Sequence, residues 1–258
     1  MRVSSLPPAP VTDPHVLTTC DDGVLTIELS RREKKNALTT GMYHGMADAL
    51  EAARRDGEVR AVYLRGQEDL FTAGNDLGDF LRADARAERA APRFLHEVAG
   101  FPKPVVAAVG GTAIGVGTTM LMHCDLVVAS DDARFQLPFV NLGLCPEAGS
   151  SLLLPQLAGP RLAAELLLLG DFFDAATALR AGIVNRVVPA TDVLSLGLDL
   201  ARRLARQPAE ALVTTKALLR RPSQRAVRDA IDEELPHFER LLQSDEARAI
   251  FRAFLERR

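Results

Sequence analysis

Residues 105–125 read Val105-Val106-Ala107-Ala108-Val109-Gly110-Gly111-Thr112-Ala113-Ile114-Gly115-Val116-Gly117-Thr118-Thr119-Met120-Leu121-Met122-His123-Cys124-Asp125. The five small apolar residues at the start of this segment predict a buried strand, and the glycine pair that follows predicts its end. The apolar run after the later glycines predicts a helix that ends near Cys124-Asp125. The backbone is therefore expected to turn from a strand into a helix at a junction rich in glycine.

This junction has two interpretations. The first N–H groups of a helix have no acceptor inside the helix, and glycines allow another molecule to approach them closely, so a group that is or becomes anionic would fit here. Alternatively, the small residues only permit tight packing between the helix and the strand. A dinucleotide site is disfavoured, because the third glycine of a G-x-G-x-x-G motif beginning at Gly115 would fall on Met120.

The composition is that of an ordinary soluble chain. The 258 residues are 47% hydrophobic and 25% charged, which predicts a substantial core in one large domain or one domain with an appendage. A net charge of -3 disfavours nucleic acid and anionic membranes as partners. The three scattered cysteines do not suggest a disulfide framework, so we expect a reducing, cytoplasmic environment. The proline-rich start does not resemble a secretory signal, and no apolar run is long enough to span a membrane.

Hydrophobic periodicity and turn residues divide the chain into three parts. Residues 1–14 are expected to form a loose arm, residues 15–190 a sheet-containing core, and residues 191–258 a helical appendage. Strands are predicted at 16–20, 24–29, 61–65, 105–109, 126–129, 134–137 and 186–188, and the first two form a hairpin. Helices are predicted at 40–55, 84–99, 149–157, 160–169 and 174–180, the first with Thr39 as its cap; beyond 192 the pattern is helical, punctuated by Pro208, Pro222 and Pro236.

Several catalytic motifs are absent from the sequence. There is no G-x-S-x-G or H-E-x-x-H motif, and the five histidines lack metal-ligand spacing, so hydrolysis by serine or zinc is disfavoured and no metal is expected. Residues 71–77 form a second strand end with a small, glycine-containing turn. Backbone N–H groups near Ala73 and near Val116 could therefore converge on a carbonyl oxygen as an oxyanion hole.

Glu147 is the one carboxylate in the apolar loop of residues 138–151 and lies isolated among Leu142, Leu144, Cys145 and Pro146. Burial among apolar residues should raise its pKa, which would suit it to remove and return a proton. Alternatively, Glu147 could stabilise the dipole of the helix that follows it. The pattern alone leaves both interpretations open.

Three segments, Phe71–Leu77, Gly111–Gly117 with Cys124-Asp125 behind it, and Leu142–Gly149, together resemble the crotonase (enoyl-CoA hydratase/isomerase) superfamily. The helical continuation to the end of the chain fits as well, so the resemblance covers residues 15–258. It implies an α/β fold, a spiral of β-β-α turns with a C-terminal helical region used in trimer formation. It also implies acyl-CoA thioester substrates, no cofactor beyond the coenzyme A of the substrate, and a homotrimer or a dimer of trimers.

The resemblance also implies roles for particular residues. Ala73 and Val116 would supply the two N–H groups that bind the thioester oxygen. Lys34, Lys35 and Arg257 match positions that would contact coenzyme A phosphate, although charged residues in loops and tails are usually only solvated. The other implied substrate contacts are Gly74, Asp76, Leu77, Gly115, Phe139, Leu142 and Phe254.

The chain departs from the hydratases of this superfamily at two positions. They carry glutamates where this chain has Thr119 and Phe139, whereas Glu147 lies in a Pro-Glu-Ala-Gly turn similar to that of the 3-enoyl-CoA to 2-enoyl-CoA isomerases. The leading hypothesis is therefore an isomerase with Glu147 as its single acid and base. The alternatives are another crotonase-type enzyme (hydratase, hydrolase or ring-altering isomerase) on an aromatic or branched acyl-CoA, or a non-catalytic acyl-CoA-binding member.

Overall fold

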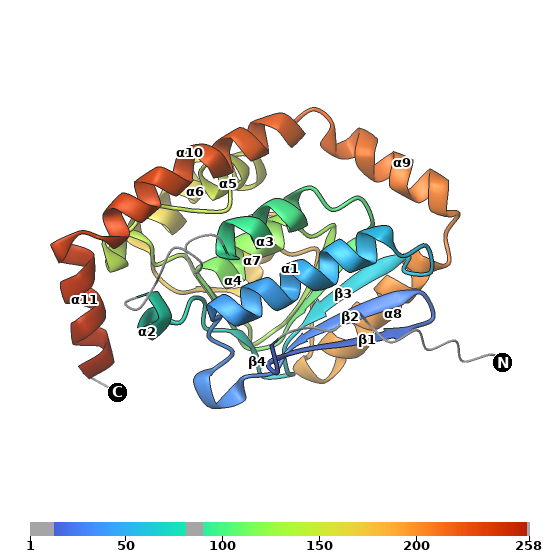
Figure 1. The fold of residues 1–258 in the computed structure, drawn as a ribbon, viewed down its shortest axis with the longest axis horizontal. Helices are drawn as coiled ribbons and strands as arrows, with labels where there is room; N and C mark the ends of the chain where they lie inside the picture. The colour runs from blue at the N-terminus through green and yellow to red at the C-terminus, as the bar shows by residue number, and fades with distance from the viewer. Residues whose placement is uncertain (1–12, 81–89, 257–258) are drawn as a thin grey trace.

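The computed structural model describes residues 13–80 and 90–256, which form two β-sheets surrounded by helices (Figure 1). The larger sheet has the strand order β1-β2-β3-β5-β7-β10, and the smaller has the order β4-β6-β8-β9. The strands are β1 (Val16–Asp21), β2 (Val24–Leu29), β3 (Ala61–Arg65), β4 (Leu70–Thr72), β5 (Val105–Val109), β6 (Thr112–Ile114), β7 (Leu126–Ser130), β8 (Arg134–Gln136), β9 (Phe173–Asp174) and β10 (Arg186–Val188).

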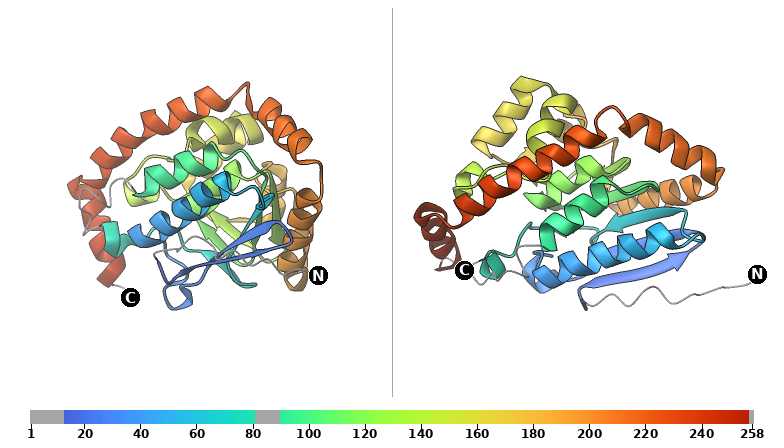
Figure 2. Two further views of the ribbon diagram at one scale, coloured as in Figure 1. Left: turned by 45° about the vertical axis from the view of Figure 1, so that its right-hand side comes forward. Right: turned by 45° about the horizontal axis from the view of Figure 1, so that its top comes forward.

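Helices connect these strands and continue to the end of the described chain. The α-helices are α1 (Thr40–Arg55), α2 (Leu77–Phe80), α3 (Ala90–Ala99), α4 (Val116–Thr119), α5 (Ser150–Ala158), α6 (Pro160–Leu169), α7 (Ala175–Arg180), α8 (Val193–Ala205), α9 (Ala209–Arg220), α10 (Gln224–Leu242) and α11 (Asp245–Glu256). Short 3-10 helices are η1 (Arg32–Lys34), η3 (Met120–His123), η4 (Val140–Leu142) and η5 (Ala190–Asp192). The last three α-helices arch around one side of the molecule (Figures 1 and 2).

The chain builds both sheets at once. After the antiparallel β1-β2 hairpin, each turn adds one strand to the larger sheet and the next strand to the smaller one: β3 then β4, β5 then β6, and β7 then β8. The neighbours within each of these series pair in parallel. This repetition is the spiral of β-β-α turns implied by the resemblance, and it places the ends of β4 and β6 side by side.

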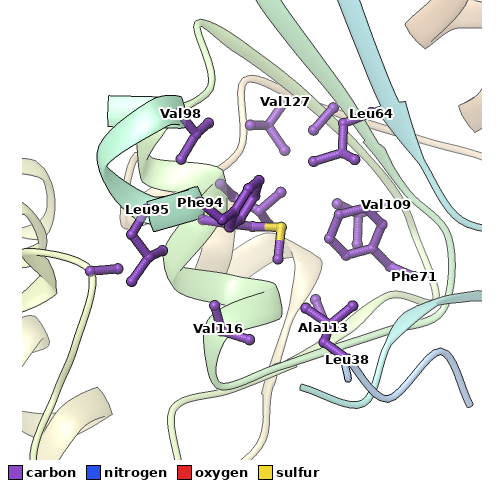
Figure 3. Packing of buried hydrophobic residues seen from close by; sticks show 14 of the residues in the cluster. Leu38, Leu64, Phe71, Phe94, Leu95, Val98, Val109, Ala113, Val116 and Val127 are labelled. Atoms are coloured by element: carbon purple, nitrogen blue, oxygen red, sulfur yellow. The ribbon is translucent and has the colours of Figure 1, made fainter. Parts of the chain in front are cut away.

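The principal core lies between the sheets and the helices on one face of the larger sheet. Figure 3 shows Phe94, Leu95 and Val98 of α3 on one side of this cluster and Phe71 and Val109, which belong to the two sheets, on the other. A second cluster packs α8 against the opposite face of the larger sheet. Its members from α8 include Val193, Leu200 and Ala201.

Most predicted elements agree with the structure, with several corrections. The strands β4 and β6 and the brevity of α4, a single turn followed by η3, were not predicted. The helical region after residue 190 is not wholly an appendage, since α8 covers the sheet, and Pro236 lies inside α10 without ending it. The loose arm predicted for 1–14 and the first part of the helix predicted for 84–99 fall largely outside the described residues.

Among the helices that the structure describes, none combines the length and hydrophobicity needed to cross a membrane.

Candidate active site

A cavity of about 820 Å³ opens beside the adjoining ends of β4 and β6. Both glycine-rich strand ends line it, because β4 and β6 are paired in the smaller sheet. Their close approach requires glycine at position 74, where the φ angle is 82° and a Cβ atom would lie 2.6 Å from the Ile114 carbonyl oxygen. The cavity also brings together almost all the residues that the sequence marked as substrate contacts: Lys34, Lys35, Gly74, Asp76, Leu77, Gly115, Phe139, Leu142 and Phe254.

The structure corrects one of the two predicted N–H donors. The N–H group of Ala73 already donates to the Lys35 carbonyl oxygen over 2.9 Å, so it is not available to a ligand. Two residues later, the N–H group of Asn75 has no acceptor among the described residues, and Asn75 lines the cavity. The free N–H group at this strand end is therefore that of Asn75.

The second N–H group at this cavity without an acceptor among the described residues is that of Val116, which stays a prediction as a donor to the substrate. It is the first residue of α4, and its N–H group has no acceptor in the described part of the chain, as expected at a helix N-terminus. The preceding Gly115 has φ 56° and ψ -120°, a conformation that side chains disfavour, and it turns the chain from β6 into α4 beside the cavity. Two free N–H groups thus border one cavity from neighbouring strand ends.

Glu147 borders a second, smaller cavity of about 100 Å³. The two cavities share Asn75 and Phe238 in their walls, so Glu147 and Asn75 line the same small cavity. Glu147 Oε1 accepts a hydrogen bond of 2.5 Å from the Thr119 hydroxyl, which stands at the position of a hydratase glutamate. Burial raises the pKa of Glu147 to about 8, although the Thr119 hydrogen bond lowers it and the charge of Glu234 adds to the increase.

The alternative interpretation of Glu147, as a carboxylate that stabilises the dipole of the following helix, finds no support in the contacts. The side chain that accepts hydrogen bonds at the N-terminus of α5 is Glu234, from the backbone N–H groups of Gly149 and Ser151. The Glu147 carboxylate is instead directed at Thr119. Glu147 therefore does not cap α5, and it lines the smaller cavity.

The remaining predicted residues have mixed outcomes. The Asp76 carboxylate accepts hydrogen bonds from Arg31, at 2.7 Å, and from two backbone N–H groups at the start of α2, so it braces the loop that carries Asn75. Arg257 lies outside the described residues.

Within the described ranges 13–80 and 90–256, no three His, Cys, Asp or Glu side chains gather where they could hold a metal ion.

Sequence reasoning did not single out three residues of this site. Tyr43 of α1 donates a hydrogen bond of 2.5 Å to the Asn75 side chain, and its pKa is raised well above the usual value by burial and by the charge of Glu147. Glu234 of α10 contacts the turn after Glu147. Asn75 stands inside the recognised motif, but the sequence does not reveal which N–H group of that motif lacks an acceptor.

Comparison with known families identifies the fold. The family model described as enoyl-CoA hydratase/isomerase matches residues 19–258. The chain belongs to this family. Among solved structures, the enoyl-CoA hydratase/isomerase from Pseudoalteromonas atlantica T6c is similar with a TM-score of 0.89 and 39% identity, covering 95% of this chain and 98% of that one.

Characterised members of the family with different activities are similar to the chain to about the same degree. It is 33% identical over 237 residues to the 2,3-dehydroadipyl-CoA hydratase of Escherichia coli (strain K12), covering 91% of this chain and 93% of that protein. It is 35% identical over 226 residues to the enoyl-CoA delta isomerase 2 of Rattus norvegicus, covering 85% of this chain and 58% of that longer protein. Family membership therefore indicates an enzyme of an acyl-CoA family, but it does not distinguish a hydratase from an isomerase.

Proposed function

We propose that this protein is an acyl-CoA double-bond isomerase that converts 3-enoyl-CoA into 2-enoyl-CoA. The observation that carries the proposal is the position of Glu147, a buried carboxylate of raised pKa that lines a small, mainly apolar cavity together with Asn75, one of the two residues with a free backbone N–H group. A group with a pKa of about 8 can both accept and return a proton near neutral pH.

In the proposed reaction, the thioester oxygen binds between the N–H groups of Asn75 and Val116. Glu147 removes a proton from C2, the C2–H electron pair enters the conjugated system, and negative charge develops on the thioester oxygen. The two N–H dipoles stabilise this dienolate without having to reorient. The protonated Glu147 then donates its proton to C4 as the double bond settles between C2 and C3.

The residues at positions 119 and 139 argue against hydration. Adding water across a 2-enoyl thioester requires groups that hold and activate the water molecule, and the family's hydratases use glutamates there. Thr119 donates its hydroxyl hydrogen to Glu147, and Phe139 is a buried aromatic side chain in the wall of the larger cavity. Neither can act as a carboxylate base, so we expect weak or no hydratase activity.

The larger cavity supports a role in binding the coenzyme A part of the substrate. The residues that line this cavity include Lys34, Lys35 and Phe254 of α11. The two lysines could bind the phosphate groups of coenzyme A. The acyl part would then enter the smaller cavity past Glu147. Its apolar lining comes from α1, α3 and α10, including Tyr43, Leu95 and Phe238.

A panel of acyl-CoA thioesters tests the proposed function. Purified protein should convert 3-enoyl-CoA substrates to the conjugated 2-enoyl products, which absorb in the ultraviolet, and should hydrate crotonyl-type thioesters poorly. Efficient hydration would favour a hydratase. Thioester binding without isomerisation and without exchange of the C2 protons with heavy water would favour a non-catalytic binding protein.

A further inference from the structure

Glu234 is a buried carboxylate on α10, far along the chain from the candidate site, that binds the backbone immediately after Glu147. Its side chain is 7% exposed. One oxygen accepts the N–H group of Gly149 over 2.6 Å, and the other accepts the N–H group and the hydroxyl of Ser151 over 2.9 Å and 2.5 Å. The N-terminus of α5 is thus capped by a residue from another helix.

The backbone held by Glu234 is a strained turn. Ala148 has φ 64° and Gly149 has φ 68°, so two successive residues after Glu147 are in the left-handed region, which a residue with a Cβ atom such as Ala148 adopts only at a cost of about 1 kcal/mol or more. The Ala148 carbonyl oxygen accepts a hydrogen bond of 2.8 Å from the buried His123 ring. Burial lowers the pKa of His123 to about 4, so its ring is neutral near pH 7.

No side chain of the loop or of α5 itself caps the start of α5, because the N-cap residue is Gly149. The orphan N–H groups there depend on Glu234. Since helix α10 also lines the smaller cavity through Ile231, Leu235 and Phe238, it both builds a cavity wall and fixes the turn that carries the proposed base.

We propose that Glu234 is a positioning residue for Glu147: by capping α5 from α10 it holds the Ala148-Gly149 turn in the conformation that directs the Glu147 carboxylate at the substrate. This inference rests on the proposed function, in which Glu147 transfers the proton. The C-terminal helices are accordingly part of the catalytic apparatus, and α10 sets the geometry of a base that lies on another segment.

Glu234 also acts on the proton affinity of Glu147. The titratable and charged groups around Glu147 are Tyr43 of α1, Asp79 of α2, His123 of η3, Cys145 on its own loop, and Glu234 and Glu239 of α10. Of these, the negative charge of Glu234 raises the pKa of Glu147. Removing that charge should lower it.

The test compares Glu234→Gln and Glu234→Asp with Glu233→Gln as a matched control, since Glu233 is exposed on the same helix. A glutamine side chain at position 234 has one oxygen in place of two, so it cannot accept all three hydrogen bonds from Gly149 and Ser151. Its NH2 group would face a backbone N–H group of the turn. We expect Glu234→Gln to reduce kcat for 3-enoyl-CoA about tenfold with an almost unchanged KM, because the base is misplaced and the substrate contacts are not. The acidic limb of kcat/KM should move to lower pH.

Rescue and control variants separate positioning from simple stabilisation. Glu234→Asp keeps the charge and should retain the parent pH profile with part of the lost kcat restored, while Glu233→Gln should match the parent. If Glu234→Gln lowers only the melting temperature and leaves kcat and the pH limb as in the parent, the inference is overturned. Should that variant not fold, Ser151→Ala replaces it: removing one donor should reduce kcat at constant KM, and a parent value of kcat would overturn the inference.

Glu147→Gln is measured alongside to separate the two proposals. If that variant isomerises at nearly the parent rate, the assignment of Glu147 itself fails. If it is inactive while Glu234→Gln behaves as the parent protein, only the role of Glu234 fails.

Discussion

At position 147 the protein balances two opposing influences on a single carboxyl group. Burial and the charge of Glu234 raise the pKa of Glu147, whereas the hydrogen bond from Thr119 lowers it, with a value of about 8 as the result. A base with too high a pKa is largely protonated near pH 7, while one with too low a pKa removes a proton from carbon poorly. Thr119 therefore increases the fraction of enzyme in which Glu147 is ionised.

This balance predicts the effect of Thr119→Val. Loss of the hydroxyl removes an interaction that favours the charged form, so the pKa of Glu147 should rise further. Activity depends on ionised Glu147, and the acidic limb of kcat/KM should therefore move to higher pH, with the largest loss below pH 8 and little loss well above it. The measurement is a pH–rate profile, with Thr119→Ser as a control that keeps the hydroxyl. An identical limb in the Val variant and the parent would rule out this role for Thr119.

The sequence allowed Glu147 to be predicted but not its neighbours. A lone carboxylate in an apolar loop is visible as a pattern, and its turn resembles a known one. Tyr43, Asn75 and Glu234 line the same cavity as Glu147 only through tertiary contacts, and the hydrogen bond from Gly149 to Glu234 joins residues 85 positions apart. No local pattern could relate residues so far apart.

At the scale of helices and strands, prediction succeeded where an element was long enough to display its period. The bounds of α1 and of the six-residue strand β2, Val24–Leu29, agree with the prediction, and Thr39 caps α1 as expected, by accepting the N–H group of Met42. Of the three-residue strands, β8 and β10 were predicted, whereas β4 and β6 lie in glycine-containing segments that predict turns. The single turn of α4 is too short for a period of 3.6 residues to appear. These short elements are the ones that present the two donors.

The start of α4 gives a direct test of the oxyanion hole. Val116→Pro removes one N–H group at the first helical position, where proline is tolerated and no internal hydrogen bond is lost. We expect kcat to fall about 10²–10³-fold, because the donor acts on charge that develops in the transition state. Val116→Ala shortens the side chain but keeps the N–H group, so it should remain within a few-fold of the parent. Equal activities for the two variants, measured under single-turnover conditions, would exclude the Val116 donor.

At the scale of the whole molecule, the predicted boundary near residue 190 separates sheet from helix but does not separate two cores. An amphipathic helical pattern reports that one face is buried without reporting what covers it. Helix α8 packs against the larger sheet, whereas residues of α10 line the smaller cavity and Phe254 of α11 lines the larger cavity. Residues distant in sequence thus complete the site, and Figure 1 shows the arch that α9, α10 and α11 form around one side of the molecule.

Large exposed apolar side chains lead us to expect an oligomer. Leu168 and Leu169 at the end of α6 are 66% and 57% exposed, Phe172 is 49% exposed, and Leu219 of α9 is 76% exposed. Side chains of this kind on a surface are typical of interfaces between subunits. We predict a trimer or a dimer of trimers, measurable as the mass in light scattering at working concentration. A monodisperse monomer would contradict this prediction.

The central claim is that the carboxylate of Glu147 moves the proton, and Glu147→Gln tests it most directly. The amide preserves the size of the side chain but cannot accept a proton from C2. In heavy water, the parent protein should incorporate deuterium into 3-enoyl-CoA and its product, while the Gln variant should bind the thioester with nearly the parent affinity and lose about 10⁴-fold in both isomerisation and exchange. Isomerisation or exchange by the variant at a rate close to that of the parent would contradict the account.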